Sequence, residues 1–122
     1  QNDAIAFRSG TSNTTVYRNI IADNYGAGIT VNNGASGITI SQNSIYGNGT
    51  ITSRNGTAAS GIVGIDLQNS TDNNQVGTAP YFTLNDTGDS DTGGNDLQNF
   101  PVINIARSTG SQITISGSLN SK

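Results

Sequence analysis

The feature that most constrains this chain is a repeat. Residues 4–25 align with residues 28–49 without a gap, at a shift of 24 positions, and seven of the twenty-two pairs are identical. A unit this short cannot enclose a core of its own, so we expect each copy to bury its apolar residues against the next copy. The identical pairs are Ile5/Ile29, Gly10/Gly34, Ser12/Ser36, Thr15/Thr39, Asn19/Asn43, Ile21/Ile45 and Asn24/Asn48.

A third copy appears when residues 50–63 are treated as an insertion. Ile65 then follows Ile29, and Val76 follows Ile40, although the column of Asn19 and Asn43 now holds Ala79. We therefore expect stacked repeats over residues 1–84, a polar loop over residues 85–100 and a strand segment over residues 101–122.

Within each copy the apolar residues alternate in short bursts, separated by Gly, Asn and Ser. This two-residue period is typical of strands, and three short strands in about 24 residues predict an all-β chain folded as a parallel β-solenoid of about three coils. An antiparallel sandwich also gives alternation, but it has no reason to repeat at 24 with an aligned Asn. The expected stacking ladders are Ile5, Ile29 and Ile65; Phe7, Val31 and Leu67; Val16, Ile40 and Val76; Ile21, Ile45 and Tyr81; and Asn19 with Asn43.

The composition supports an ordered chain with little helix. Only 11% of the 122 residues are charged and 32% are hydrophobic, yet the net charge of −3 is too small for the self-repulsion typical of disorder. There is no Cys, His or Met. These absences exclude disulfides, thiolate sites and a Ser-His-Asp triad, and they predict an excerpt or a processed product. The acidic balance argues against nucleic acid, and no apolar run is long enough to predict membrane insertion.

Two segments carry a resemblance to a known family. GITISQNSIYGNG at residues 37–49 and the run NDTGDSDTGGNDLQNFPVI at residues 85–103 resemble the right-handed parallel β-helix repeat proteins of large secreted or surface-attached bacterial polypeptides. The resemblance implies a right-handed parallel β-helix, secretion and a role at the cell surface. It also implies that LQNFPV marks the passage to a following β-sandwich region, of which this chain contains one predicted strand, ITISGSL.

The polar loop is a candidate metal site. Residues 85–96 contain four Asp and two Asn among Gly residues, and hard oxygen ligands on a Gly-rich loop are what Ca²⁺ requires. The loop is not an EF-hand, because no Glu closes it, and a solvated turn with Asp capping backbone amides is the alternative. The candidate calcium ligands are Asp86, Asp89, Asp91, Asn95 and Asp96.

Five Asn residues lie in Asn-x-Ser/Thr sequons, which mark possible glycan acceptors on exported proteins. The sequons at Asn48 and Asn55, which flank the inserted loop, are the preferred candidates. The full set is Asn13, Asn48, Asn55, Asn69 and Asn85.

The alternative function is a carbohydrate-binding module or a polysaccharide lyase or hydrolase. Pectate-lyase-like enzymes on this scaffold use Asp clusters, sometimes with Ca²⁺, and a basic residue. Here the Arg residues form no evident pair with a carboxylate cluster, and Asp23, Asp66 and Asp72 are expected to be solubilising or turn residues. The residues that could stack on sugars are Tyr17, Tyr25, Tyr46 and Tyr81.

The ends of the stack complete the prediction. Stacked strands leave unpaired edges at both ends, and the sequence shows no amphipathic helix to cover them. We expect these edges to pair with copies of the chain, head to tail in a filament, or with adjacent solenoid or sandwich domains. Ile113 and Ile115 lie on an alternating strand suited to donation. The prediction is a non-catalytic structural or adhesive module, extracellular or at the cell surface, with glycans as further partners.

Overall fold

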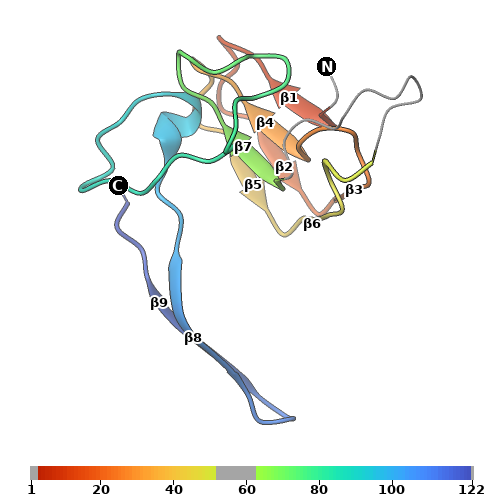
Figure 1. Cartoon of the computed structure of the whole chain (residues 1–122), viewed down its shortest axis with the longest axis vertical. Helices are drawn as coiled ribbons and strands as arrows, with labels where there is room; N and C mark the ends of the chain where they lie inside the picture. The colour runs from red at the N-terminus through yellow and green to blue at the C-terminus, as the bar shows by residue number, and fades with distance from the viewer. Residues whose placement is uncertain (1–2, 52–62, 122) are drawn as a thin grey trace.

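The computed structural model describes residues 3–51 and 63–121, and within them the chain is nearly all-β, which agrees with the predicted all-β class (Figure 1). Their strands form one three-stranded and three two-stranded sheets, which are separate and do not join into a closed solenoid. The elements are β1 (Ile5–Phe7), β2 (Thr15–Tyr17), β3 (Ile20–Ala22), β4 (Ile29–Val31), β5 (Thr39–Ser41), β6 (Ser44–Tyr46), β7 (Ile65–Leu67), the 3₁₀ helix η1 (Gly94–Leu97), β8 (Val102–Ser108) and β9 (Ile113–Ser118).

The strands of the first repeat pair in parallel with those of the second at an offset of 24 residues. β1 pairs with β4, β2 with β5 and β3 with β6, so that Ile5 lies opposite Ile29 and Val16 opposite Ile40. β7 continues the first sheet on the other side of β4, with Ile65 opposite Ile29. The offset there is 36 residues, because the predicted insertion lies between them; its residues 52–62 lie outside the described residues.

The bends between strands also recur at 24 residues. Four positions of the first repeat have a positive φ, and each has a partner with a positive φ in the second repeat. Only one of the four pairs is Gly with Gly; Asn, Asp, Arg and Gln fill other positions of this left-handed region, which side chains other than Gly rarely adopt. The shared bends show that the backbone, and not only the apolar pattern, repeats. The pairs are Gly10/Gly34, Asn13/Gly37, Arg18/Gln42 and Asp23/Gly47.

The core lies between the three sheets of the two repeats. Ile29 and Val31 of β4 are fully buried, since β4 has a strand on both sides. Phe7, Val16 and Ile21 of the first repeat pack in the same cluster. Burial of each such side chain contributes about 1.5–3 kcal/mol, so this small cluster holds the repeats together.

The third repeat departs from the prediction after β7. Val76 lies in a turn and is 38% exposed, and Tyr81 lies outside any strand at φ +67°, so neither continues its ladder. Residues 68–84 lack the apolar alternation of a strand, and Asn69 and Asn73 bind their own local backbone in turns instead. A later segment takes the vacant place, because the Gly94 N–H donates to the Gln68 carbonyl.

The predicted C-terminal strand is one half of a hairpin. β9 pairs in antiparallel fashion with β8, with a bulge between Ile103 and Ile105. We did not predict β8, although residues 102–106 contain apolar residues and Gly110 at φ +85° makes the turn. The hairpin projects from the stacked repeats (Figure 1), and every residue of both strands is exposed.

None of the helical segments in residues 3–51 and 63–121 has the length and apolar character required to cross a membrane.

Candidate functional site

Three carboxylates of the predicted metal loop lie together. One oxygen from each of Asp86, Asp89 and Asp91 lies within 4.8 Å of the others. Asp86 accepts hydrogen bonds from the Ser90 hydroxyl at 2.6 Å and from the Ser90 N–H, and these bonds hold the pKa of Asp86 below its ordinary value. Asp89 is buried and accepts from the Asn99 N–H and the Ser121 hydroxyl, each at 2.9 Å. These hydrogen bonds fix Asp86 and Asp89 in place beside Asp91.

Amide side chains tie this loop to the base of the hairpin. Asn99 accepts from the Asp86 N–H at 3.0 Å and donates to the Asp86 carbonyl at 2.9 Å, and a further bond joins its amide to the Asn120 carbonyl. Asn85 makes a similar two-bond contact with the backbone of Phe100. The position of the acidic loop is thus coupled to the two chain segments that enter and leave the hairpin.

The other two predicted metal ligands do not belong to this group. The Asn95 side chain accepts from the Ile38 N–H at 2.9 Å and donates to the Ile38 carbonyl at 2.7 Å, so it binds the second repeat in the manner of a strand. Asp96 is exposed in η1 at φ +55°. Three acids supply fewer ligands than the six to eight oxygens that Ca²⁺ takes, so backbone carbonyls and water would complete the set.

The repeated Asn residues form two stacked pairs. Asn43 accepts from the backbone N–H of Asn19 at 2.9 Å and from its side chain at 3.2 Å, and it donates to the Val16 carbonyl. Asn24 and Asn48 repeat this arrangement one bend later. Each Asn thus bridges two repeats where the strands end.

The sequons fall in different environments. Asn48 is 5% exposed and its amide nitrogen donates to the Ile21 carbonyl, so the atom that would carry a glycan is buried. Asn85 uses its amide nitrogen on Phe100, and Asn55 lies outside the described residues. Asn13 is exposed on a bend. Asn69 is half-buried and accepts from the Thr71 hydroxyl of its own sequon at 2.7 Å.

Asp66, expected to be solubilising, is 4% exposed on β7. Burial raises the pKa of Asp66 from its ordinary value of 3.8 to about 6; the bond from the Gln68 amide at 3.0 Å opposes this rise, and the nearby Asp72 and Asp3 add to it. The polar alternation of β7 could not reveal this burial, because residues 69–83 cover the outer face of the strand. Asp23, by contrast, is exposed on the bend after β3.

Two cavities adjoin β7. The first, of about 290 Å³, is an apolar space at the end of the stack between Ile40, Ile65, Leu67 and the rings of Phe82 and Phe100. These rings meet edge to face at a centroid distance of 6.5 Å. The second, of about 280 Å³, lies on the outer side of β7 and includes Asp66. The first cavity therefore lies among apolar side chains at the end of the stack. The second is lined by the carboxyl groups of Asp66 and Asp72.

Comparison with protein-family models, curated proteins and solved structures found no significant match to this chain. The resemblance to β-helix repeat proteins thus rests on the repeat and the LQNFPV run alone.

Proposed function

We propose that this chain is a non-catalytic structural or adhesive module of an extracellular or cell-surface protein or fibre. In this proposal its repeats are coils of a right-handed parallel β-helix, which leads into a hairpin that joins neighbouring units. The chain would pair with copies of itself or with adjacent β-domains.

The observation that carries the proposal is the register of the paired strands. Each strand of the first repeat lies beside the strand 24 residues later, and β7 adds a third strand to the first sheet. Parallel strands reached by a complete circuit of the chain are typical of β-solenoids, and solenoids serve widely as extended scaffolds.

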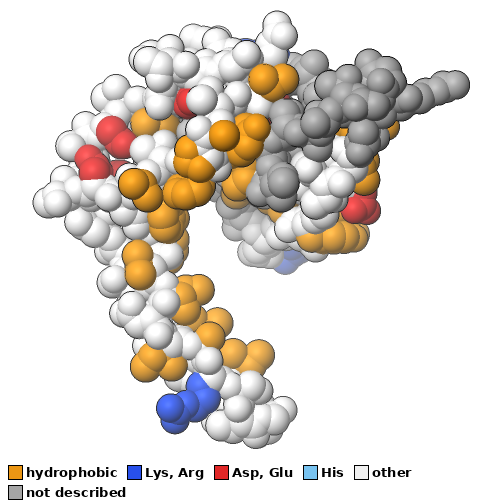
Figure 2. Space-filling view, in the orientation of Figure 1, with side chains coloured by type: hydrophobic (Ala, Val, Ile, Leu, Met, Phe, Trp, Pro, Cys, Tyr) orange, Lys and Arg blue, Asp and Glu red, His pale blue; other side chains and the backbone are white. Residues whose placement is uncertain are grey.

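The hairpin supports the part of the proposal that concerns assembly. An isolated two-stranded hairpin is marginally stable in water, and this one exposes Ile103, Ile113 and Ile115, each by more than 60%. Figure 2 shows hydrophobic side chains along its length. Ile113 and Ile115 lie on the same face of β9, since side chains two apart share a face. Pairing of the hairpin with a neighbouring chain would bury these side chains.

Assembly is tested by sedimentation at increasing protein concentration together with negative-stain imaging. We expect self-association of the native chain and its loss in the double variant Ile113→Thr, Ile115→Thr. The matched control is Thr114→Ser, which alters the opposite face of the same strand. A native chain that remains monomeric at every concentration would contradict self-assembly.

We further propose that Asp86, Asp89 and Asp91 bind Ca²⁺. A bound cation would relieve the repulsion between three close carboxylates and fix the loop at the base of the hairpin. Calcium at 100 times its dissociation constant would then stabilise the fold by about 2.7 kcal/mol, seen as a higher Tm. We expect Asp91→Asn to lose this response and Asp96→Asn to keep it; equal responses in both variants would contradict the assignment.

Glycosylation, if it accompanies export, is proposed at Asn13 and Asn69 rather than at the buried Asn48. Mass spectrometry of the chain from a glycosylating host tests this choice. A glycan on Asn48 of the folded chain would contradict it.

A further inference from the structure

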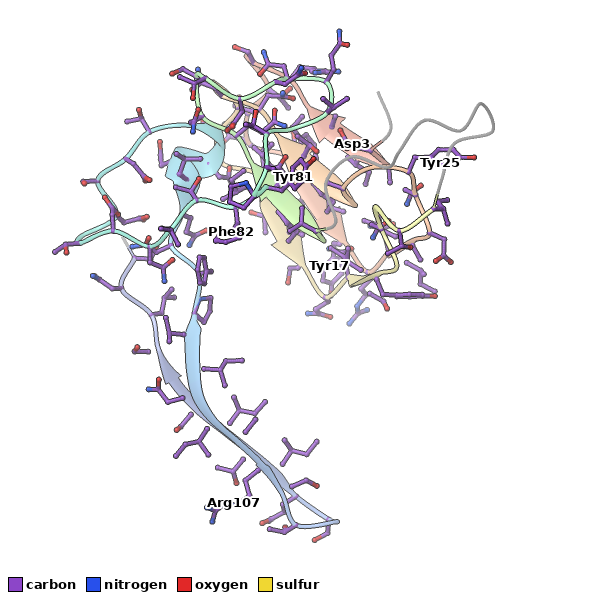
Figure 3. The ribbon with its side chains drawn as sticks, in the orientation of Figure 1. Asp3, Tyr17, Tyr25, Tyr81, Phe82 and Arg107 are labelled. Atoms are coloured by element: carbon purple, nitrogen blue, oxygen red, sulfur yellow. The ribbon has the colours of Figure 1, made fainter. Side chains whose placement is uncertain are left out.

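The cavity on the outer side of β7 combines acids with aromatic rings. It has a volume of about 280 Å³, and its polar lining includes Asp66, Asp72 and Thr78. Tyr81 and Phe82 also line it, and Figure 3 shows both side chains beside β7. No Lys or Arg is among the described residues that line this cavity. Its chemistry is therefore anionic and aromatic at once.

The side chains that act on the Asp66 carboxyl, among the described residues, include no cation. Asp66 is only 4% exposed, and the side chain that donates a hydrogen bond to it is the neutral amide of Gln68. The charged groups that act on it, Asp72 and Asp3, have the same sign. Arg8 donates a hydrogen bond to the Asn74 carbonyl of the covering loop. A buried carboxylate in this setting favours a bound positive charge.

The backbone brings an aromatic ring up to that carboxylate. A Cβ built on Gly77 would lie 2.8 Å from Asp66 Oδ2 and 2.9 Å from Tyr81 Cδ1, so only Gly allows both groups to approach here. Tyr81 itself holds φ +67°, a conformation that is rare for a bulky residue. A cation near a Tyr or Phe ring is attracted by the ring face, and a carboxylate attracts it further.

We propose that this cavity, the amine pocket, binds an organic ammonium ion, with Asp66 and Asp72 as counter-charges and Tyr81 and Phe82 as aromatic walls. The anionic lining repels acidic ligands, and the faces of the aromatic rings attract an organic cation. An alkylammonium group satisfies both halves of the lining, because its charge meets the acids and its carbon chain meets the rings. The proposal goes beyond the scaffold role and does not depend on self-assembly.

The test uses n-pentylammonium chloride as the probe and 1-pentanol as its neutral analogue. Binding is followed by the backbone amide shifts of Gly77 and Tyr81 in the full chain, with NaCl at matched ionic strength as the blank. We expect saturable shifts with the amine and much smaller shifts with the alcohol. Because Asp66 titrates near pH 6, the amine should bind about fivefold to tenfold more tightly at pH 7 than at pH 5.

Two variants separate the pocket from non-specific attraction. Asp66→Asn should weaken amine binding at pH 7 and remove its pH dependence, while Tyr81→Asn, which tolerates the positive φ, should weaken binding without removing that dependence. Asp23→Asn removes an exposed acid elsewhere and should bind as the native chain does. Equal shifts with 1-pentanol or NaCl, or native affinity in Asp66→Asn, would overturn the proposal.

Discussion

At the scale of single residues, Asn side chains replace backbone peptides where the strands end. Asn43 and Asn48 each accept from the preceding repeat and donate back to it, so a side-chain amide continues the hydrogen-bonding of the strand through the bend. A buried group of this kind contributes about 1 kcal/mol when bonded and costs about 1–3 kcal/mol when its partner is lost.

The first prediction concerns Asn48. Asn48→Ala leaves the Ile21 carbonyl and the Asn24 amide without this partner, so we expect the free energy of unfolding to fall by about 2–3 kcal/mol in a urea titration. Asn33→Ala, at an exposed position of the same repeat, is the control and should change stability by no more than about 0.5 kcal/mol. Equal losses in the two variants would show that burial of the Asn48 amide has no special role.

The second prediction concerns the pH dependence of Asp66. Its folded-state pKa of about 6 lies above the ordinary value of 3.8, so the folded chain holds this proton more tightly than the unfolded chain. The contribution of Asp66 to stability therefore falls as pH rises from about 4 to about 6, by about 1–3 kcal/mol. Asp66→Asn should be the more stable protein at pH 7 and similar to the native chain near pH 4. An Asp66→Asn variant less stable than the native chain at pH 7 would contradict this.

Residues whose contacts could be predicted from the sequence differ from the others in where their partners lie along the chain. The two Asn columns were visible because their partners lie at a fixed spacing in the repeat. The burial of Asp66 and the strain at Tyr81 depend on residues 69–83, a segment without a period that folds over β7. Contacts made by a segment of this kind cannot be read from spacing.

At the scale of elements, the third repeat gives way to a cap. All-β structure followed from the alternation of apolar residues, but the expected strands after β7 required apolar residues that residues 68–84 do not place in register. η1 lies there instead, and Asn95 binds both backbone groups of Ile38. The end of the stack is therefore covered by a 3₁₀ helix and a loop, and no helical pattern in the sequence predicts them.

The third prediction tests this cap. Asn95→Ala loses both bonds to Ile38 and also places Ala at φ +50°, so we expect a loss of about 2–4 kcal/mol and faster hydrogen exchange at the Ile38 amide. Asn95→Gly loses the same bonds but accepts this φ, and it should be about 1 kcal/mol more stable than Asn95→Ala. If Asn95→Gly retained native stability, the two bonds would not be what holds the cap.

At the scale of the whole molecule, the stacked repeats and the hairpin differ in how they are held. β4 is buried and paired on both sides, whereas each strand of the hairpin pairs only with the other. Local opening should follow this difference, because strands with few buried apolar contacts exchange their amide hydrogens soonest.

The fourth prediction is therefore an order of hydrogen-exchange protection in dilute monomer. We expect β4 to be protected most, β1 and β7 less, and β8 and β9 least. An increase in protection of β8 and β9 with protein concentration would identify them as the covered surface in an assembly. Protection of the hairpin equal to that of β4 in dilute monomer would contradict the expected order.

The equal spacing of bends and strands makes the second repeat a unit that can be duplicated. A tandem copy of residues 25–48 would present the same backbone to the first repeat on one side and to β7 and η1 on the other. The chain could thus be lengthened by whole repeats while both of its ends keep their present contacts. Its length would depend on how many copies of the repeat are encoded, and η1 and the loops around it would need no change.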